Sequence, residues 1–162
     1  IWRGPVIGGV VQQFWGDVIW DDVDYMFVDM PPGTGDIQIT LSQKIDMDGA
    51  VIVSTPQDIA LIDAVKGVNM FKRVDVPILG IVENMSYYVC EKCGTRADIF
   101  GHEGARKTAD SLGVPFLGEI PLHIDIRTNA DNGTPIVVSK PDSPHTKAYL
   151  DIAAKVKAEL GL

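Results

Sequence analysis

Two cysteines stand in the string Cys90-Glu91-Lys92-Cys93-Gly94. The two intervening residues let both thiolates converge on one metal ion, and Gly94 allows a tight turn behind them. A redox pair of the thioredoxin kind would sit at a helix N-terminus, which lowers a thiol pKa. These cysteines instead fall in a predicted loop, so the spacing favours metal binding over disulfide chemistry.

The number of ligands decides what kind of metal site this pair can form. A structural zinc knuckle needs four ligands, and the sequence has no second C-x-x-C and no well-spaced Cys/His pair. A symmetric dimer that brings two copies of the pair together would supply four thiolates, which suits a [4Fe–4S] cluster and also zinc. Two inert surface thiols are the remaining alternative.

A second candidate site follows the apolar run Tyr25–Met30, which carries Asp29 near its end and continues as Pro31-Pro32-Gly33-Thr34-Gly35-Asp36. A carboxylate at the carboxyl end of a buried strand can hold Mg²⁺ through water. The glycines let the backbone approach a phosphate and move when it leaves. We interpret the string as a Walker-B carboxylate and a switch loop; the alternative is that Asp29 only caps a turn.

The elements that position these residues alternate between two hydrophobic patterns. Short runs rich in branched residues predict strands buried on both faces: Tyr25–Met30, Ala50–Ser54, Ile78–Glu83 and Phe116–Ile120. Between them, apolar residues recur at helical spacing, most clearly from Leu61 to Phe71 and from about His102 to Leu112. This alternation predicts an α/β fold, a mostly parallel sheet with helices on both faces.

Three further segments complete the prediction. Val6, Val10, Phe14 and Val18 recur every fourth residue and predict an amphipathic helix. Ser143 and Pro144 predict the start of a last helix, whose expected buried residues are Tyr149, Ile152, Ala153, Val156 and Leu160. The stretch 86–101 is long for a connection in an α/β fold, so we expect a functional loop there.

Composition excludes several classes of protein. The 162 residues carry a net charge of −8, which argues against a surface that wraps nucleic acid or a polybasic membrane anchor. The sequence has no apolar run of transmembrane length and no visible signal peptide, and two cysteines cannot form a disulfide framework, so we expect the cytoplasm. We expect surface roles for His102, His123 and His145, and a solvated turn for the acidic residues from Asp17 to Asp24.

Several strings, in this order, resemble the Mrp/ApbC-type iron–sulfur cluster carriers, relatives of the MinD and ParA ATPases with a deviant Walker A loop. They are Asp24–Asp36, Ser54-Thr55-Pro56-Gln57, Glu83-Asn84-Met85-Ser86, Cys90-x-x-Cys93-Gly94 and Gly118-Glu119-Ile120-Pro121-Leu122. The cysteine pair with Glu-Asn-Met-Ser before it is the specific part. The resemblance covers nearly the whole chain.

The resemblance implies a homodimeric ATPase that assembles a labile [4Fe–4S] cluster between subunits and passes it to apo-proteins. Its implied site residues are Asp29 near Mg²⁺; Gly33, Thr34 and Gly35 as the γ-phosphate switch; Asn84, Pro121 and Leu122 around adenine; and Cys90 and Cys93 at the cluster. A carboxamide at a strand end also suits a purine edge on physical grounds, although an Asn that starts a turn is an equal alternative. Asp63 matches only weakly a helix residue that faces the partner subunit in this family. We interpret Arg127 as a surface arginine and assign no role to Arg3.

The sequence departs from this family at its start, because it holds no G-x-x-x-x-G-K-[ST] string and no deviant P-loop with its lysine. We therefore expect residues 1–162 to be a single partial domain with a metal-binding loop at 86–101, lacking the N-terminal strand and P-loop, poorly soluble and unable to hydrolyse ATP unaided. Two rival functions are a partitioning or positioning ATPase, against which the lack of a basic or amphipathic C-terminal tail in this sequence counts, and a zinc-bridged structural dimer.

Overall fold

A three-stranded parallel sheet forms the centre of the molecule, in the order β1 (Ala50–Ser54), β2 (Ile78–Asn84) and β5 (Phe116–Ile120). The structure is a computed structural model that describes residues 4–30, 33 and 35–162. In the register of the sheet, Ile52 pairs with Ile81 and Val82 pairs with Gly118. These three strands confirm the expectations for 50–54, 78–83 and 116–120.

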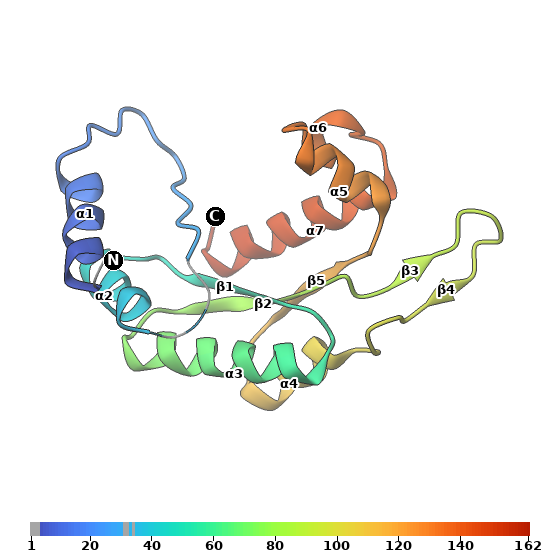
Figure 1. Cartoon of the computed structure of the whole chain (residues 1–162), viewed down its shortest axis with the longest axis horizontal. Helices are drawn as coiled ribbons and strands as arrows, with labels where there is room; N and C mark the ends of the chain where they lie inside the picture. The colour runs from blue at the N-terminus through green and yellow to red at the C-terminus, as the bar shows by residue number, and fades with distance from the viewer. Residues whose placement is uncertain (1–3, 31–32, 34) are drawn as a thin grey trace.

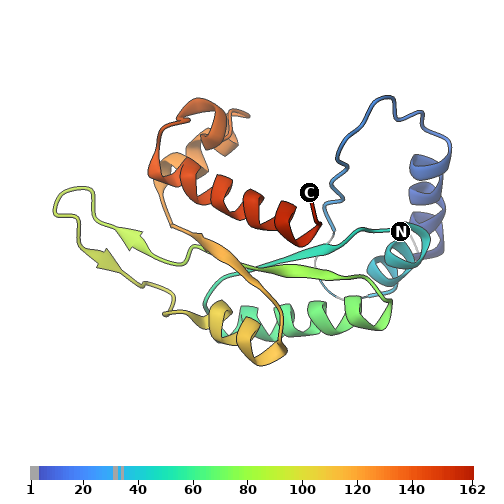
Figure 2. The same ribbon diagram turned by 180° about the vertical axis from the view of Figure 1, so that it is seen from behind.

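Helices cover both faces of this sheet, as Figures 1 and 2 show. On one face lie α3 (Asp58–Arg73) and α4 (Gly104–Leu112), and on the other α7 (Pro144–Glu159) packs over β5 and β2. The predicted stripe of α3 is buried at Leu61, Ala64, Val68, Met70 and Phe71. The α/β fold with a parallel sheet between two helical layers is therefore confirmed.

The segment 25–30, predicted as a strand, is not one. It runs as an extended loop between α1 and α2 (Figure 1), and the side chain of Phe27 is 88% exposed. A strand exists only where a neighbouring strand accepts and donates its backbone hydrogen bonds. Within the described residues this segment has no such partner, and the prediction from its apolar residues was wrong.

The N-terminal helices pack on each other at one end of the sheet. The helix α1 (Gly4–Gly16) confirms the helix predicted there but not its expected apolar face, and it contacts α2 (Asp36–Lys44). Phe14, expected on its buried side, is 61% exposed, and Val18 lies beyond its last residue.

The expected loop at 86–101 contains a small β-hairpin instead of irregular chain. Its strands are β3 (Tyr88–Val89) and β4 (Arg96–Ala97), antiparallel, with Tyr88 opposite Ala97. The turn is closed by the backbone N–H of Cys90, which donates to the Thr95 carbonyl at 2.9 Å, and by the N–H of Gly94, which donates to the Cys90 carbonyl at 2.8 Å. The hairpin projects beyond the sheet (Figures 1 and 2), so the cysteine turn is presented to solvent on a regular element.

The C-terminal part folds as α5 (Ile124–Asp131), α6 (Ile136–Ser139) and α7. The Ser143 hydroxyl oxygen accepts a hydrogen bond from the Thr146 N–H at 3.0 Å and caps α7, as predicted. The half-buried side chains Tyr149, Ile152 and Val156 pack on the core cluster of Val82, Leu117 and Ile120. Ala153 is exposed, contrary to expectation.

Two other details bear on the predictions. The helix α4 ends at Gly113, whose φ of +63° is the left-handed geometry expected of a glycine after Leu112. Among the described residues, no helix has both the length and the apolar character needed to cross a membrane.

Candidate functional site

A cavity of about 630 Å³ lies between β1, α3 and the segment around residue 29. Its lining includes Asp29, Gly33 and Asn84, so the predicted Mg²⁺ carboxylate and switch glycine lie beside the predicted adenine residue, which is far from them in the chain. They meet because Asn84 ends β2 at the carboxyl edge of the sheet, where ligands bind in open α/β folds. Thr55, directly after β1, and Asp63 on α3 line the same cavity.

Of the three predicted switch residues, Gly33 lines the cavity and Gly35 does not, and Thr34 lies outside the described residues. Gly33 adopts a φ of +97°, a conformation that favours glycine. Gly35 is the residue from which α2 begins, and its carbonyl accepts a hydrogen bond from the Ile39 N–H at 3.2 Å. Arg3 also lies outside the described residues.

The Asn84 side chain is half-buried and already makes one hydrogen bond. Its Oδ1 accepts from the backbone N–H of Met85 at 2.9 Å, and Met85 has a left-handed φ of +54°. Asn84 therefore starts a turn, as the alternative interpretation held. In the described chain its Nδ2 has no hydrogen-bond partner, so an acceptor on a ligand could use it.

Pro121 and Leu122 do not line the cavity that holds Asp29 and Asn84. Pro121 is buried and Leu122 is half-buried in the segment after β5. The Leu122 N–H donates to the Tyr87 carbonyl at 2.7 Å, and the Ser86 N–H donates to the Ile120 carbonyl at 3.0 Å. These bonds join the end of β5 to the base of the hairpin.

Cys90 is half-buried and Cys93 is exposed in the hairpin turn. The Cys93 Sγ lies 3.2 Å from the Thr95 hydroxyl. Hydrogen bonding with the Thr95 side chain and backbone lowers the pKa of the Cys93 thiol, which favours the thiolate that binds metals. No cluster of three or more Cys, His, Asp or Glu that could hold a metal occurs among the described residues, so one chain offers two thiols here.

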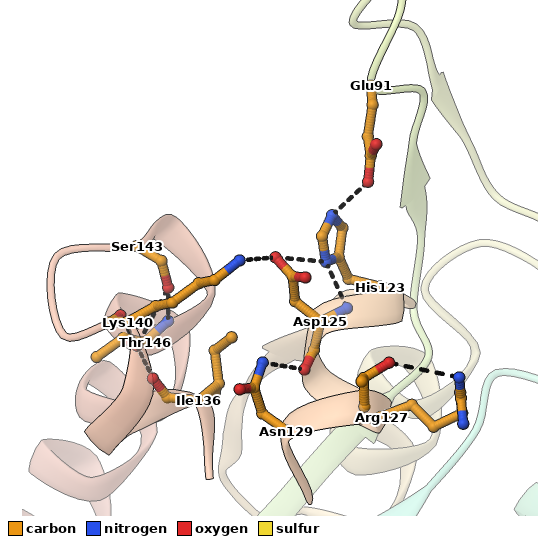
Figure 3. A network of polar contacts seen from close by, with 10 residues as sticks. Glu91, His123, Asp125, Arg127, Asn129, Ile136, Lys140, Ser143 and Thr146 are labelled. Atoms are coloured by element: carbon orange, nitrogen blue, oxygen red, sulfur yellow. Dashed lines mark hydrogen bonds and ion pairs between the residues drawn. The ribbon is translucent and has the colours of Figure 1, made fainter. Parts of the chain in front are cut away.

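One residue between the cysteines reaches the body of the protein, and sequence reasoning missed its partner. Glu91 Oε1 lies 3.1 Å from His123 Nε2, and the His123 Nδ1 accepts a hydrogen bond from the Asp125 N–H at 3.1 Å (Figure 3). The His123 side chain is only 14% exposed, so the surface role expected for it was wrong. No sequence signal links these positions, because they lie in different elements and only the fold brings them together.

The other two histidines differ from each other in burial. His102 is 56% exposed and lies 3.1 Å from Asp98, in agreement with its expected surface role. His145 is half-buried, and its ring centroid lies 4.1 Å from that of His123. Burial is the largest cause that lowers the pKa of His145. His145 is therefore partly withdrawn from the surface position expected for it.

The other residues singled out from the sequence lie at the surface. Arg127 donates to Asp131 at 2.7 Å with 66% of its side chain exposed, in agreement with a surface arginine. Asp63 pairs with Lys66 at 2.9 Å, and the acidic residues from Asp17 to Asp24 are exposed.

Comparison with known proteins identifies the family of this chain. Residues 1–157 match the ParA family described as NUBPL iron-transfer P-loop NTPase. The chain is 54% identical over 160 residues to the "Iron-sulfur cluster carrier protein" of Haemophilus influenzae, covering 99% of this chain and 43% of that protein. The chain spans about half the length of the curated relatives it matches.

Solved structures agree with the fold. A nucleotide-binding protein of Archaeoglobus fulgidus in complex with ADP superposes with a TM-score of 0.75 at 37% identity, over 87% of this chain and 57% of that one. The cell division ATPase MinD of Pyrococcus furiosus gives a TM-score of 0.70 at 24% identity, over 96% of this chain and 59% of that one, and shows the fold alone.

Proposed function

This chain belongs to the family of NUBPL iron-transfer P-loop NTPases, and its relatives include proteins named as iron–sulfur cluster carrier and transfer proteins, so we propose that it binds an iron–sulfur cluster as cargo and transfers it to apo-proteins. The ligands in this proposal are Cys90 and Cys93. The observation that carries it is their place on the turn of a projecting hairpin, where a second copy can approach.

The number of thiols supports a site shared by two copies. A [4Fe–4S] cluster takes four thiolates, and each chain offers Cys90 and Cys93. A homodimer with its two-fold axis near the hairpin turns completes the set. The lowered pKa of Cys93 favours the deprotonated ligand that such a cluster requires.

Nucleotide binding is the second part of the proposal. Asp29 is assigned to Mg²⁺, with Gly33, Thr34 and Gly35 near the γ-phosphate of ATP. The cavity shared by Asp29, Gly33 and Asn84 supports this assignment, as does the ADP complex of the Archaeoglobus relative. Pro121 and Leu122 are assigned to the adenine side together with Asn84.

The wider assignment follows the family. We place residues 1–162 in one cytoplasmic domain with its metal-binding hairpin at 86–101, and we assign it no nucleic-acid or membrane partner. Its partners in this proposal are a second copy and the recipient apo-proteins.

Anaerobic reconstitution with iron and sulfide tests the cargo and its ligands. The expected product has a broad visible charge-transfer band, binds iron and not zinc, and elutes as a dimer. The double variant Cys90→Ala/Cys93→Ala is expected to lose the band, while Lys92→Ala between them keeps it. Zinc in place of iron, or a band retained in the double variant, contradicts the proposal.

A further inference from the structure

We propose that His123 is a positioning residue for the cysteine pair, which holds the hairpin turn in place through Glu91. The inference rests on the proposed function, in that the positioned thiols are those assigned to the cluster. Its structural basis is the 3.1 Å contact between His123 Nε2 and Glu91 Oε1.

The fold sets the direction of this hydrogen bond. His123 is the N-cap of α5, and its Nδ1 accepts from the Asp125 backbone N–H. In a neutral imidazole one nitrogen accepts and the other donates. The ring proton of the neutral imidazole therefore resides on Nε2 and points at the Glu91 carboxylate. The hydrogen bond that caps α5 thus leaves Nε2 as the donor to Glu91.

A second aromatic ring packs against that of His123. His145 packs on it at a centroid distance of 4.1 Å, with the ring planes inclined by 36°. Figure 3 follows the polar contacts further: the Asp125 carboxylate pairs with Lys140, whose carbonyl accepts from the Thr146 hydroxyl at 2.7 Å. Thr146 is 1% exposed. A chain of contacts thus runs from the core to the hairpin turn.

The base of the hairpin is attached to the body by contacts of its own, whereas the turn is attached through Glu91. Tyr87 is held by the Leu122 N–H, and the Arg96 guanidinium stacks 4.0 Å from the Tyr87 ring centre and lies 3.7 Å from Glu119. In the turn itself, Cys90, Cys93 and Gly94 bond only within the hairpin. Among the hydrogen bonds and ion pairs of the described chain, the Glu91–His123 contact is the one that ties residues 90–94 to the body.

The β5–α5 connection contributes to the cysteine turn and, in the proposed function, also to the nucleotide site. His123 directly follows Pro121 and Leu122, which are assigned to the nucleotide base, and it reaches the residue that follows Cys90. The orientation of the thiols is therefore set from the β5–α5 connection and not by the hairpin alone.

Four variants separate this role from a general effect on folding. His123→Asn keeps a capping acceptor for the Asp125 N–H but is too short to reach Glu91, since Asn is among the preferred N-cap residues. Glu91→Ala removes the acceptor, whereas Glu91→Gln keeps an acceptor without the charge. Lys92→Ala is the matched control, because Lys92 shares the turn and makes no hydrogen bond or ion pair within the described residues.

The first measurement is hydrogen–deuterium exchange of the Cys90 and Gly94 amides in the metal-free protein. Loss of one hydrogen bond predicts about three- to tenfold faster exchange in His123→Asn and in Glu91→Ala. Glu91→Gln and Lys92→Ala are expected to exchange near the wild-type rate, and the double variant His123→Asn/Glu91→Ala no faster than either single one. Wild-type exchange in both single variants, additive effects in the double variant, or loss of protection in Glu91→Gln overturns the proposal.

The second measurement is the rate at which a chelator removes iron from the reconstituted protein. The same order is expected, with faster loss in His123→Asn and Glu91→Ala and rescue in Glu91→Gln; equal rates in all variants overturn the positioning role. The two proposals fail differently. A wild type that takes up no iron contradicts the carrier function, while the exchange experiment still decides whether His123 positions the turn.

Discussion

The carboxylate of Glu83 accepts a hydrogen bond from the backbone N–H of Ala105 at 2.6 Å, so the end of β2 holds the first turn of α4. Its other oxygen accepts from the Ser86 hydroxyl at 2.5 Å, and the Glu83 side chain is completely buried. A carboxylate at a helix N-terminus is favoured by the helix dipole and by the unpaired N–H groups there. This contact fixes the residue beside Asn84 at the edge of the candidate site.

Replacement of Glu83 by Ala is expected to lower the free energy of unfolding by about 2–4 kcal/mol, because it leaves a buried N–H unpaired and opens a cavity. Glu83→Gln keeps an acceptor for Ala105 and a donor for Ser86, so we expect a loss of about 1 kcal/mol. Urea unfolding measures both. Glu159→Ala, an exposed carboxylate at the end of α7, is the control and should stay within about 0.5 kcal/mol of wild type. An equally small effect of Glu83→Ala would contradict this role.

The stability of the protein is expected to fall on acidification partly through His145. Burial, then His123 and Lys140, lowers the pKa of His145 in the folded state, against an opposite effect of Asp125. The folded state then binds fewer protons than the unfolded one, so this contribution is present above about pH 6.5 and is lost as the pH falls through the folded pKa. Urea unfolding at about pH 7.5 and 5.5 should show a smaller loss in His145→Asn than in wild type. An unchanged pH dependence in the variant contradicts the assignment.

A methyl group at Gly104 is expected to disturb the junction of β1 and α4. A Cβ there would lie 2.5 Å from the Pro56 carbonyl oxygen and 2.9 Å from Leu61 Cδ1, so the backbone must shift. We expect Gly104→Ala to destabilise the protein by about 1–3 kcal/mol. Gly9→Ala is a matched control, because nothing lies within 4 Å of its Cβ and alanine favours a helix. Thermal unfolding compares the two, and equal midpoints would show that the close approach to Pro56 is relieved without cost.

Two exposed apolar side chains are expected to promote self-association. Val53 on β1 is 60% exposed and Phe27 is 88% exposed. Exposed apolar patches at a sheet favour aggregation. Phe27→Ser and Val53→Thr should therefore reduce light scattering at high protein concentration and leave the free energy of unfolding near the wild-type value. A large loss of stability in either variant would mean that these side chains are buried in solution.

The central sheet and its main helix could be predicted from local pattern alone. β1, β2 and β5 lie where continuous apolar runs end at turn residues, and α3 buries the stripe that begins at Leu61. Burial is encoded there in the spacing of neighbouring residues, so each element carries its own signal. The segment 25–30 carries the same signal and is not a strand in the structure, because pairing depends on a neighbour that its own residues do not specify.

The candidate site also has features that the sequence predicts and contacts that only the fold creates. The sequence by itself determined the cysteine pair, since Cys90 and Cys93 are joined by a short turn whose spacing is local, and it placed Asn84 at a strand end. Only the tertiary structure decided that Asp29 and Asn84 line one cavity, that Glu83 holds α4, and that Glu91 meets His123. Each of these contacts joins residues of different segments that the folded sheet and hairpin bring together. A local sequence pattern contains no information about such distances.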